Sequence, residues 1–165
     1  MSKVEVLMSI MSQNAEEIIK RTNIKSPAVV VNQCDRNDRK NIIINDNNVD
    51  YIKTTDRGLS KSRNLAIQEA KGEYCLLCDD DEVLDDDHVE KIEAAFRKYT
   101  DADIICFIVT RDKKKHPQHN LRINYLNSLR ISSVQMVIKR TSIINNNIKF
   151  DENFGAGSPN GAGEE

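Results

Sequence analysis

Acidic side chains are concentrated between residues 79 and 87, directly after a short apolar stretch. The stretch Tyr74–Cys78 reads YCLLC, and the nine residues that follow it contain seven carboxylates. Like charges this close repel one another unless a cation lies among them, and carboxylate oxygens suit hard divalent cations such as Mg2+ or Mn2+. If the extended geometry continues past Cys78, Asp79 and Asp81 project to the same side. We therefore predict a metal site with these two ligands at the C-terminal end of a buried strand.

Other interpretations of the acidic run fit less well. Asp85–Asp87 suit a solvated helix start, where acids are favoured. An EF-hand calcium loop is excluded, because Leu84 stands where glycine is required and the preceding element is a strand. A phospho-acceptor receiver domain is disfavoured, because its paired acids should follow the first strand, and Val4–Ile10 leads to none. The strand-end metal site is the interpretation that fits best.

Length and composition are those of one globular domain. The chain has 165 residues and a net charge of −2, so a general affinity for nucleic acid is not indicated. No apolar run approaches the roughly 20 residues that span a bilayer. The first residues, MSKVEVLMSIMSQN, lack the order of a signal peptide, so a cytoplasmic location is expected.

The four cysteines indicate buried thiols in a reducing compartment. Cys75 and Cys78 form a C-x-x-C, but on an apolar strand, whereas a redox pair more usually opens a helix. Cys34 and Cys106 are isolated in the sequence, so a zinc site lacks two further ligands.

Strand and helix patterns alternate along the chain. Strands are predicted at Val4–Ile10, Pro27–Asn32, Val49–Thr54, Tyr74–Cys78, Asp103–Val109 and Val134–Ile138, while Lys40–Asn45 is ambiguous between a strand and a loop. Helices are predicted after an N-cap at Asn14, from about Gly58 to Ala70, from about Asp86 to Tyr99, and, as a short helix or turn, at Thr141–Asn146. This order predicts an α/β fold with a mostly parallel sheet and helices on both faces.

Acidic residues follow several of these strands. In such folds ligands bind beyond the carboxyl ends of the strands, where Asp35, Asp56 and Asp79–Asp81 are expected. The helix near Gly58 presents its positive N-terminus there, with Arg63 one turn further on, and anions bind at such ends. A nucleotide diphosphate is commonly held in this way. The alternatives remain that Asp35 is an ordinary turn residue, and that Arg63 covers apolar surface while pairing with an acid.

The ordered run TTDRGLSKSRNLAIQEAKGEYCLLCDDDEVLDDD resembles the nucleotide-binding half of family 2 glycosyltransferases of the GT-A fold. The matching elements are Gly58, Ser62-Arg63-Asn64, Ala70-x-Gly72-Glu73-Tyr74 and Asp79-Asp80-Asp81. Residues 150–157, FDENFGAG, followed by Gly163-Glu164-Glu165, resemble the acceptor-side segment of the family and its G-E-D or G-E-E motif.

The resemblance implies a Rossmann-like GT-A domain that transfers a sugar, with inversion, from a nucleotide-diphosphate donor, with UDP-sugars as the first expectation. By the same resemblance, Asp35, Asp56, Arg63, Asp79 and Asp80 contact the nucleotide, and Asp81 with Asp79 holds Mn2+ or Mg2+. The general base is assigned to the closing pair, with Glu165 preferred over Glu164. The acceptor is a saccharide or a lipid-linked molecule, as in bacterial polysaccharide synthesis.

The resemblance departs from the family pattern in two places. Where the family has Pro-x-aromatic-Asn after the first strand, this chain has Met11-Ser12-Gln13-Asn14, and only Asn14 matches. The chain also stops at the presumed base. We expect one domain over residues 1–165, with a donor-binding part to about residue 110 and an incomplete acceptor-side part after it.

Two rival functions and one basic segment stay open. A sugar nucleotidyltransferase shares the layout but would carry a glycine-rich basic loop after its first strand, and a nucleotide-sugar-binding remnant would bind without turnover. The run Arg111–His116 is either a solvated flap or a contact with an anionic acceptor or a membrane surface. His116 and His119 lack the helical context that would align them on a metal. The sequence does not specify the oligomeric state.

Overall fold

A seven-stranded sheet forms the centre of the computed structural model, which describes residues 2–108, 120–128 and 131–161. The strand order is β3-β4-β2-β1-β5-β7-β6. Neighbours among β4, β2, β1 and β5 are parallel, and β3 and β7 run antiparallel to theirs, so the predicted mostly parallel sheet is confirmed. The strands are β1 (Val4–Met11), β2 (Ala28–Gln33), β3 (Asp38–Ile44), β4 (Asn47–Thr54), β5 (Tyr74–Cys78), β6 (Ile104–Cys106) and β7 (Met136–Lys139).

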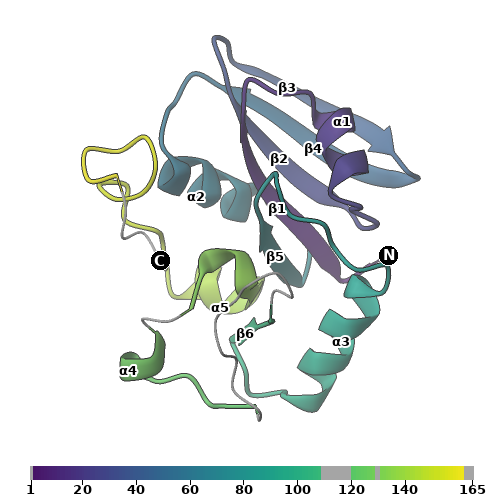
Figure 1. Cartoon of the computed structure of the whole chain (residues 1–165), viewed down its shortest axis with the longest axis vertical. Helices are drawn as coiled ribbons and strands as arrows, with labels where there is room; N and C mark the ends of the chain where they lie inside the picture. Colours follow the sequence, from purple (N-terminus) through teal and green to yellow (C-terminus); the bar gives the residue numbers. More distant parts are fainter. Residues whose placement is uncertain (1, 109–119, 129–130, 162–165) are drawn as a thin grey trace.

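Helices cover both faces of this sheet (Figure 1). The helices are α1 (Ala15–Arg21), α2 (Leu59–Glu69), α3 (His88–Lys98), α4 (Tyr125–Ser128) and α5 (Arg140–Asn145), with a 3-10 turn at Ser133–Gln135. One buried cluster joins α1 and α3 to the sheet, and a second joins α2 and α5 to its other face. The predicted α/β layering is therefore confirmed. No helix of the described residues is long and apolar enough to cross a membrane.

The central strands are apolar because both of their faces are covered. All six residues of β2 are buried, as are all five of β5. Side chains alternate between the two clusters, so Val30 packs with α1 while Val29 and Val31 pack with α2. On the α3 side, the ring of Phe96 stacks on Tyr74 with centroids 4.2 Å apart, which fixes α3 against β5.

The first helix begins where the sequence predicts. The side chain of Asn14 accepts a hydrogen bond from the N–H of Glu16 at 2.9 Å, which confirms it as the N-cap.

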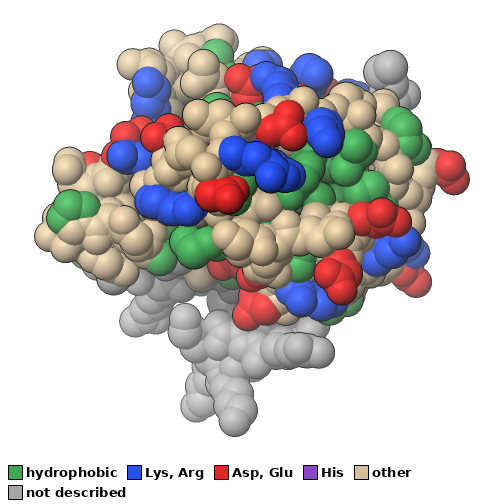
Figure 2. Space-filling model, turned by 90° about the horizontal axis from the view of Figure 1, so that it is seen from above, with side chains coloured by type: hydrophobic (Ala, Val, Ile, Leu, Met, Phe, Trp, Pro, Cys, Tyr) green, Lys and Arg blue, Asp and Glu red, His purple; other side chains and the backbone are tan. Residues whose placement is uncertain are grey.

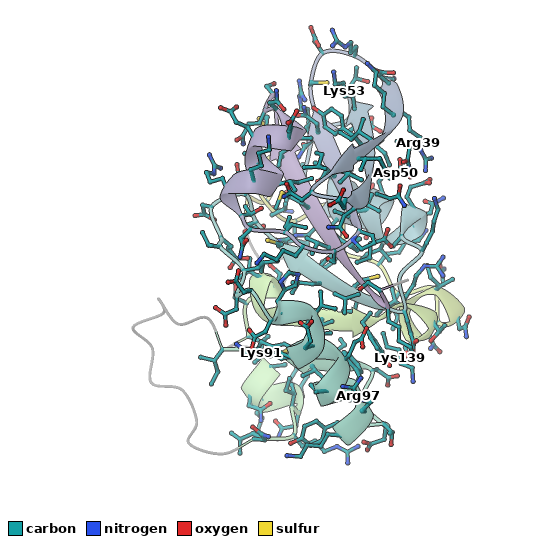
Figure 3. The ribbon with its side chains drawn as sticks, turned by 90° about the vertical axis from the view of Figure 1, so that its right-hand side faces the viewer. Arg39, Asp50, Lys53, Lys91, Arg97 and Lys139 are labelled. Carbon is teal, nitrogen blue, oxygen red and sulfur yellow. The ribbon has the colours of Figure 1, made fainter. Side chains whose placement is uncertain are left out.

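The ambiguous segment at residues 40–45 belongs to a strand, β3, which forms a hairpin with β4. Asn45 and Asp46 have φ angles of 50° and 61° and supply the two-residue turn. Arg39 of β3 lies beside Asp50 of β4 (Figure 3), and its guanidinium is 2.5 Å from the carboxylate of Asp50. The same guanidinium is 2.7 Å from the carboxylate of Glu69 on α2. This ion-pair cluster ties the hairpin to the helix on that face.

The predicted buried strand at residues 103–109 is wrong in length and burial. The strand β6 covers only Ile104–Cys106, and Ile104 is 41% exposed. The apolar sequence is typical of a central strand, but among the described residues β6 lies at the sheet edge and pairs with β7 alone. Val109 and the basic segment Arg111–His119 lie outside the described residues.

Candidate functional site

The carboxyl ends of β1, β2, β4 and β5 bring the predicted acidic residues to one edge of the sheet. Asp35 lies in a bend after β2 and Asp56 follows β4, and both are exposed. Neither carboxylate makes a hydrogen bond or ion pair with any residue that the structure describes. Asp79 follows β5 and is joined to other elements instead. The edge therefore holds one organised acidic group and two separate aspartates, Asp35 and Asp56, that have no side-chain partner among the described residues.

The acidic run begins with a turn rather than with further strand. β5 ends at Cys78, and the N–H of Glu82 donates back to the carbonyl of Asp79 at 3.4 Å. In return, a carboxylate oxygen of Glu82 accepts the N–H of Asp79 at 3.3 Å. The condition that extended geometry continues past Cys78 is thus not met, because reciprocal contacts between residues 79 and 82 close the chain into a turn. Alternation along a strand no longer places Asp79 beside Asp81.

Arg63 joins the middle of α2 to this turn. Its guanidinium Nη2 lies 3.3 Å from Oδ1 of Asp79, and its side chain is only 5% exposed. The same guanidinium lies 5.7 Å from the centroid of the Phe150 ring. The arginine thus pairs with an acid and packs on apolar surface, and in doing so it fixes one carboxylate of the predicted site.

Burial sets the protonation chemistry of the turn. Burial raises the pKa of Asp79, and Arg63 opposes this while Asp81 and Asp80 add to it. Burial, with the charges of Asp79 and Asp81, raises the pKa of Glu82 to about 7. The like charges of these acids therefore repel one another, while Arg63 partly compensates the charge of Asp79. The described residues contain no group of three His, Cys, Asp or Glu side chains arranged to hold a metal.

Asp80 is held by the segment that follows β1. Its carboxylate accepts a hydrogen bond from Gln13, and its carbonyl accepts one from Nη2 of Arg21 at 2.6 Å. The carboxylate of Asp81, by contrast, is exposed and has no hydrogen bond or ion pair within the described part of the chain. Gln13 and Arg21 were missed by the sequence reasoning. The only hint in the sequence was the unusual Met11-Ser12-Gln13 in place of Pro-x-aromatic.

A cavity of about 390 Å3 lies beside the segment that follows β1, on the α1 face of the sheet. The side chain of Asn32 donates to the carbonyl of Gln13 at 2.8 Å and to the hydroxyl of Tyr51 at 2.6 Å. Tyr51 and Lys53 of β4 line the cavity together with Gln13. These contacts fix the cavity wall next to the aspartate edge.

The N-terminus of α2 is capped by the chain itself, which corrects the expectation of an open anion site. The N–H of Leu59 donates to the carbonyl of Ala156 at 2.9 Å, and the hydroxyl of Ser60 donates to the carbonyl of Phe154 at 2.8 Å. Gly58 and Gly157 allow this close approach with φ angles of 121° and 82°. Carbonyl oxygens therefore stand at the helix start, where the sequence led us to expect phosphate oxygens.

The glycine-rich segment after β7 and α5 leads toward the predicted general base. Phe154 and Asn160 form an isolated bridge next to the start of α2. Glu164 and Glu165 themselves lie outside the described residues, so their predicted role stays a prediction. His116 and His119, which the sequence does not favour as metal ligands, also lie outside the described residues.

The remaining acids of the acidic region have structural partners. Lys91 pairs with Asp85 at 2.6 Å and with Asp87 at 2.9 Å, and Lys25 pairs with Asp86 at 2.5 Å. Asp87 stands at the N-cap of α3, but its side chain makes no capping hydrogen bond, so these acids mainly form ion pairs.

Cys75 and Cys78 pack in different core clusters on opposite faces of β5, and all of the cysteines are free. Burial raises the pKa of Cys75 to about 12, which favours the unreactive thiol. The sequence interpretation of these two residues as buried thiols is confirmed.

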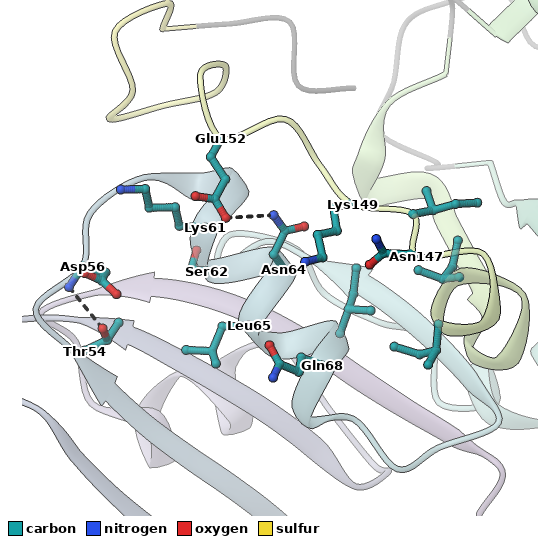
Figure 4. A pocket seen from close by; sticks show the side chains of 14 residues that line it. Thr54, Asp56, Lys61, Ser62, Asn64, Leu65, Gln68, Asn147, Lys149 and Glu152 are labelled. Atoms are coloured by element: carbon teal, nitrogen blue, oxygen red, sulfur yellow. Dashed lines mark hydrogen bonds between the residues drawn. The ribbon is translucent and has the colours of Figure 1, made fainter.

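A second cavity, of about 510 Å3, lies along α2 and is shared with α5 and the segment after it (Figure 4). Asp56 lines it, so the cavity begins at the sheet edge. On the face of the molecule shown in Figure 2, basic and acidic side chains lie next to one another rather than in patches of one sign.

Comparison with known proteins identifies the family. The family model of glycosyl transferase family 2 matches residues 12–158. A comparison with curated proteins gave no match. Among solved structures, S. aureus TarS 1-349 matches with a TM-score of 0.64 and 19% identity over 90% of this chain and 50% of that one.

The crystal structures of S. aureus TarS 1-349 in complex with UDP-GlcNAc and with UDP give TM-scores of 0.62 and 0.61 at 18% identity. These matches cover 91% and 90% of this chain and 49% and 50% of theirs. The chain thus spans about half the length of these solved structures. At this identity the likeness shows the fold. The chain belongs to glycosyl transferase family 2 and has the GT-A fold.

Proposed function

We propose that this chain forms the donor-binding part of a glycosyltransferase that moves a sugar from a nucleotide diphosphate to a hydroxyl acceptor with inversion. The observation that carries the proposal is the acidic turn after β5, held from α2 by the 3.3 Å contact of Arg63 with Asp79. Family membership and the UDP and UDP-GlcNAc complexes of the similar S. aureus TarS structures support it and favour a UDP-sugar donor.

The acidic turn fits a divalent cation that is completed by substrate. Mg2+ commonly uses one or two protein carboxylates and takes its other ligands from phosphates and water. Asp79, fixed by Arg63, and Asp81, which is exposed and unpaired among the described residues, would hold Mn2+ or Mg2+. The cation would neutralise charge on the leaving diphosphate.

The other predicted nucleotide contacts are available at the same edge. The carboxylates of Asp35 and Asp56 are exposed and have no partner among the described residues, so each is free to accept a hydrogen bond from a base or a ribose. Asp80 is held by Gln13, which fixes its carboxylate next to the segment after β1. The diphosphate lies at the acidic turn rather than at the start of α2, because the chain caps that helix.

The acceptor half of the reaction belongs to the closing residues. The attacking hydroxyl must lose a proton, and a positioned carboxylate such as Glu165, or Glu164 in its place, would accept it. The proposal also includes a saccharide or lipid-linked acceptor and a role in bacterial polysaccharide synthesis. The proposed location is cytoplasmic, with contact to the inner face of the membrane. The chain spans about half the length of the similar solved structures. We therefore propose turnover for the whole enzyme and donor binding for this chain.

Thermal unfolding with UDP, GDP, dTDP and CDP, each with and without Mn2+, tests the proposal. We expect one diphosphate, UDP first, to raise the melting temperature only with the metal, and Asp81→Asn to remove that effect. Asp85→Asn is the matched control, because Asp85 belongs to the same acidic run but pairs with Lys91. Slow hydrolysis of the matching nucleotide sugar would show a transferase, whereas binding without hydrolysis would show a remnant. No metal-dependent shift with any diphosphate would refute donor binding.

A further inference from the structure

The cavity of about 510 Å3 along α2 has two distinct walls (Figure 4). One is the outer face of α2, from which Lys61, Asn64, Leu65 and Gln68 face the cavity at helical spacing. The other is the end of α5 with the segment after it, residues 143–152. The volume falls within the range of about 300–1,000 Å3 that is usual for small-molecule sites.

One contact set makes the cavity a fixed feature. The side-chain amide of Asn64 donates to the carbonyl of Phe150 at 3.0 Å, and its oxygen accepts the N–H of Phe150 at 2.9 Å. Asn64 also donates to Oε1 of Glu152 at 3.3 Å. The two walls are therefore joined by paired hydrogen bonds, and the space beside them does not depend on a loose loop.

Several polar groups in the cavity are free to bind a ligand. The carboxylate of Asp56, the ammonium groups of Lys61 and Lys149 and the amide of Gln68 have no hydrogen bond or ion pair with residues 2–108, 120–128 or 131–161. Hydroxyl groups can donate to the carboxylate and accept from the ammonium and amide groups. The cavity thus offers both donors and acceptors along its length.

Apolar side chains lie among these polar groups. Ile144 and Ile148 are 42% and 54% exposed, and both line the cavity. The charged lining residues cancel, because Lys61 and Lys149 are matched by Asp56 and Glu152. A phosphate polymer would require an excess of lysine or arginine. A neutral ligand with hydroxyl groups and apolar C–H faces fits this balance.

We propose that this cavity binds a neutral saccharide, as the part of the acceptor that lies beyond its reacting hydroxyl. The cavity begins at Asp56, at the edge of the sheet where the donor is proposed to bind, and continues along α2 to Gln68. A saccharide whose end receives the sugar at that edge would therefore lie along α2. The identification of the saccharide as acceptor rests on the proposed function, whereas saccharide binding itself does not.

The test is an NMR titration of the isotope-labelled chain with maltotriose, cellotriose and triacetylchitotriose, without donor or metal. Each probe is added up to about 20 mM, which detects a Kd in the millimolar range. We expect at least one probe to shift the side-chain amides of Asn64 and Gln68 and the backbone signals of residues 147–149. The double variant Gln68→Ala with Lys149→Ala should raise that Kd about tenfold. Lys98→Ala, an exposed lysine on α3, is the control and should change nothing.

Three other outcomes would overturn the proposal. Shifts confined to the residues around Asp35 and Asp79, unchanged in the double variant, would place the saccharide at the edge alone. An equal response to inorganic phosphate would show an anion site, and no response to any probe would show an empty cavity. The double variant should keep the melting shift given by UDP with Mn2+. If UDP with Mn2+ does not raise the melting temperature of the unmodified chain while a saccharide still binds in the cavity, the donor site is refuted and the saccharide site is not.

Discussion

The contact between Arg63 and Asp79 makes a quantitative prediction about stability. Replacing Arg63 with methionine keeps the length of the buried stem but removes the charge. The carboxylate of Asp79 then loses its cation in a site where burial already raises its pKa. The ring of Phe150 loses the guanidinium that lies 5.7 Å from its centroid. The substitution should therefore destabilise the fold through the remaining acid rather than through a cavity.

The structure sets the size of the effect. Breaking a fully buried ion pair costs about 3–5 kcal/mol, whereas an exposed pair contributes about 0–1 kcal/mol. The Arg63 side chain is 5% exposed but that of Asp79 is 39% exposed, so this pair lies between the two cases. We expect Arg63→Met to cost about 2–3 kcal/mol of unfolding free energy, including about 0.5–1 kcal/mol for the contact with Phe150. Asp79→Asn should cost less than about 1 kcal/mol, because burial disfavours its charge.

Urea unfolding of a double-mutant cycle measures the pair directly. With Asp79→Asn already present, Arg63→Met should cost about 1 kcal/mol less than in the unmodified chain, because position 79 then no longer carries a carboxylate that loses its cation. Arg97→Met is a suitable control, since Arg97 pairs with Glu93 at the exposed end of α3. A coupling below about 0.3 kcal/mol would show that Arg63 does not hold the acidic turn.

Further predictions concern the protonation, packing and thiols of the same strand. The folded pKa of Glu82, about 7, lies above its usual value, so stability is lost as the pH rises from the usual value to the folded value. The unfolding free energy of Glu82→Gln should therefore equal that of the unmodified chain near pH 4.5 and exceed it by about 1–2 kcal/mol near pH 8.5, after allowance for solvent screening. Urea titrations in the presence of a chelator measure this difference. Gly72→Ala should cost about 2 kcal/mol, because its Cβ would lie 2.6 Å from that of Glu5, whereas Gly161→Ala, with nothing within 4 Å, should cost almost nothing in the same unfolding assay. Cys75 and Cys78 should react with a thiol reagent only after unfolding, and fast reaction of the folded chain would contradict their burial.

The layering of the fold followed from the sequence because its signals are local. The apolar stretches at residues 28–33 and 74–78 predict central strands buried on both faces, and the structure has them there. Asn14 predicts the first helix through its own capping bond. The short strand β6 was overestimated, because the apolar sequence does not reveal that the strand lies at an edge with one neighbour.

The candidate site was predicted in its residue types but not in its contacts. The turn after Cys78 depends on two reciprocal hydrogen bonds between residues 79 and 82. These bonds compete with extension of the strand, and the spacing of apolar residues in the sequence does not reveal them. The capping of α2 by Ala156 joins segments almost a hundred residues apart. The contacts of Gln13 and Arg21 with Asp80 are also long-range, with separations of 67 and 59 residues. Such contacts arise from tertiary packing, and a single sequence carries no local signal for them.

A crystal structure of the chain with UDP and Mn2+ would show where the diphosphate and the metal bind. We expect the metal between the diphosphate and the carboxylates of Asp81 and Asp79, with Arg63 still paired to Asp79 and the start of α2 still capped by residues 154–157. A diphosphate bound away from the acidic turn, with Asp79 and Asp81 both left in solvent, would contradict it.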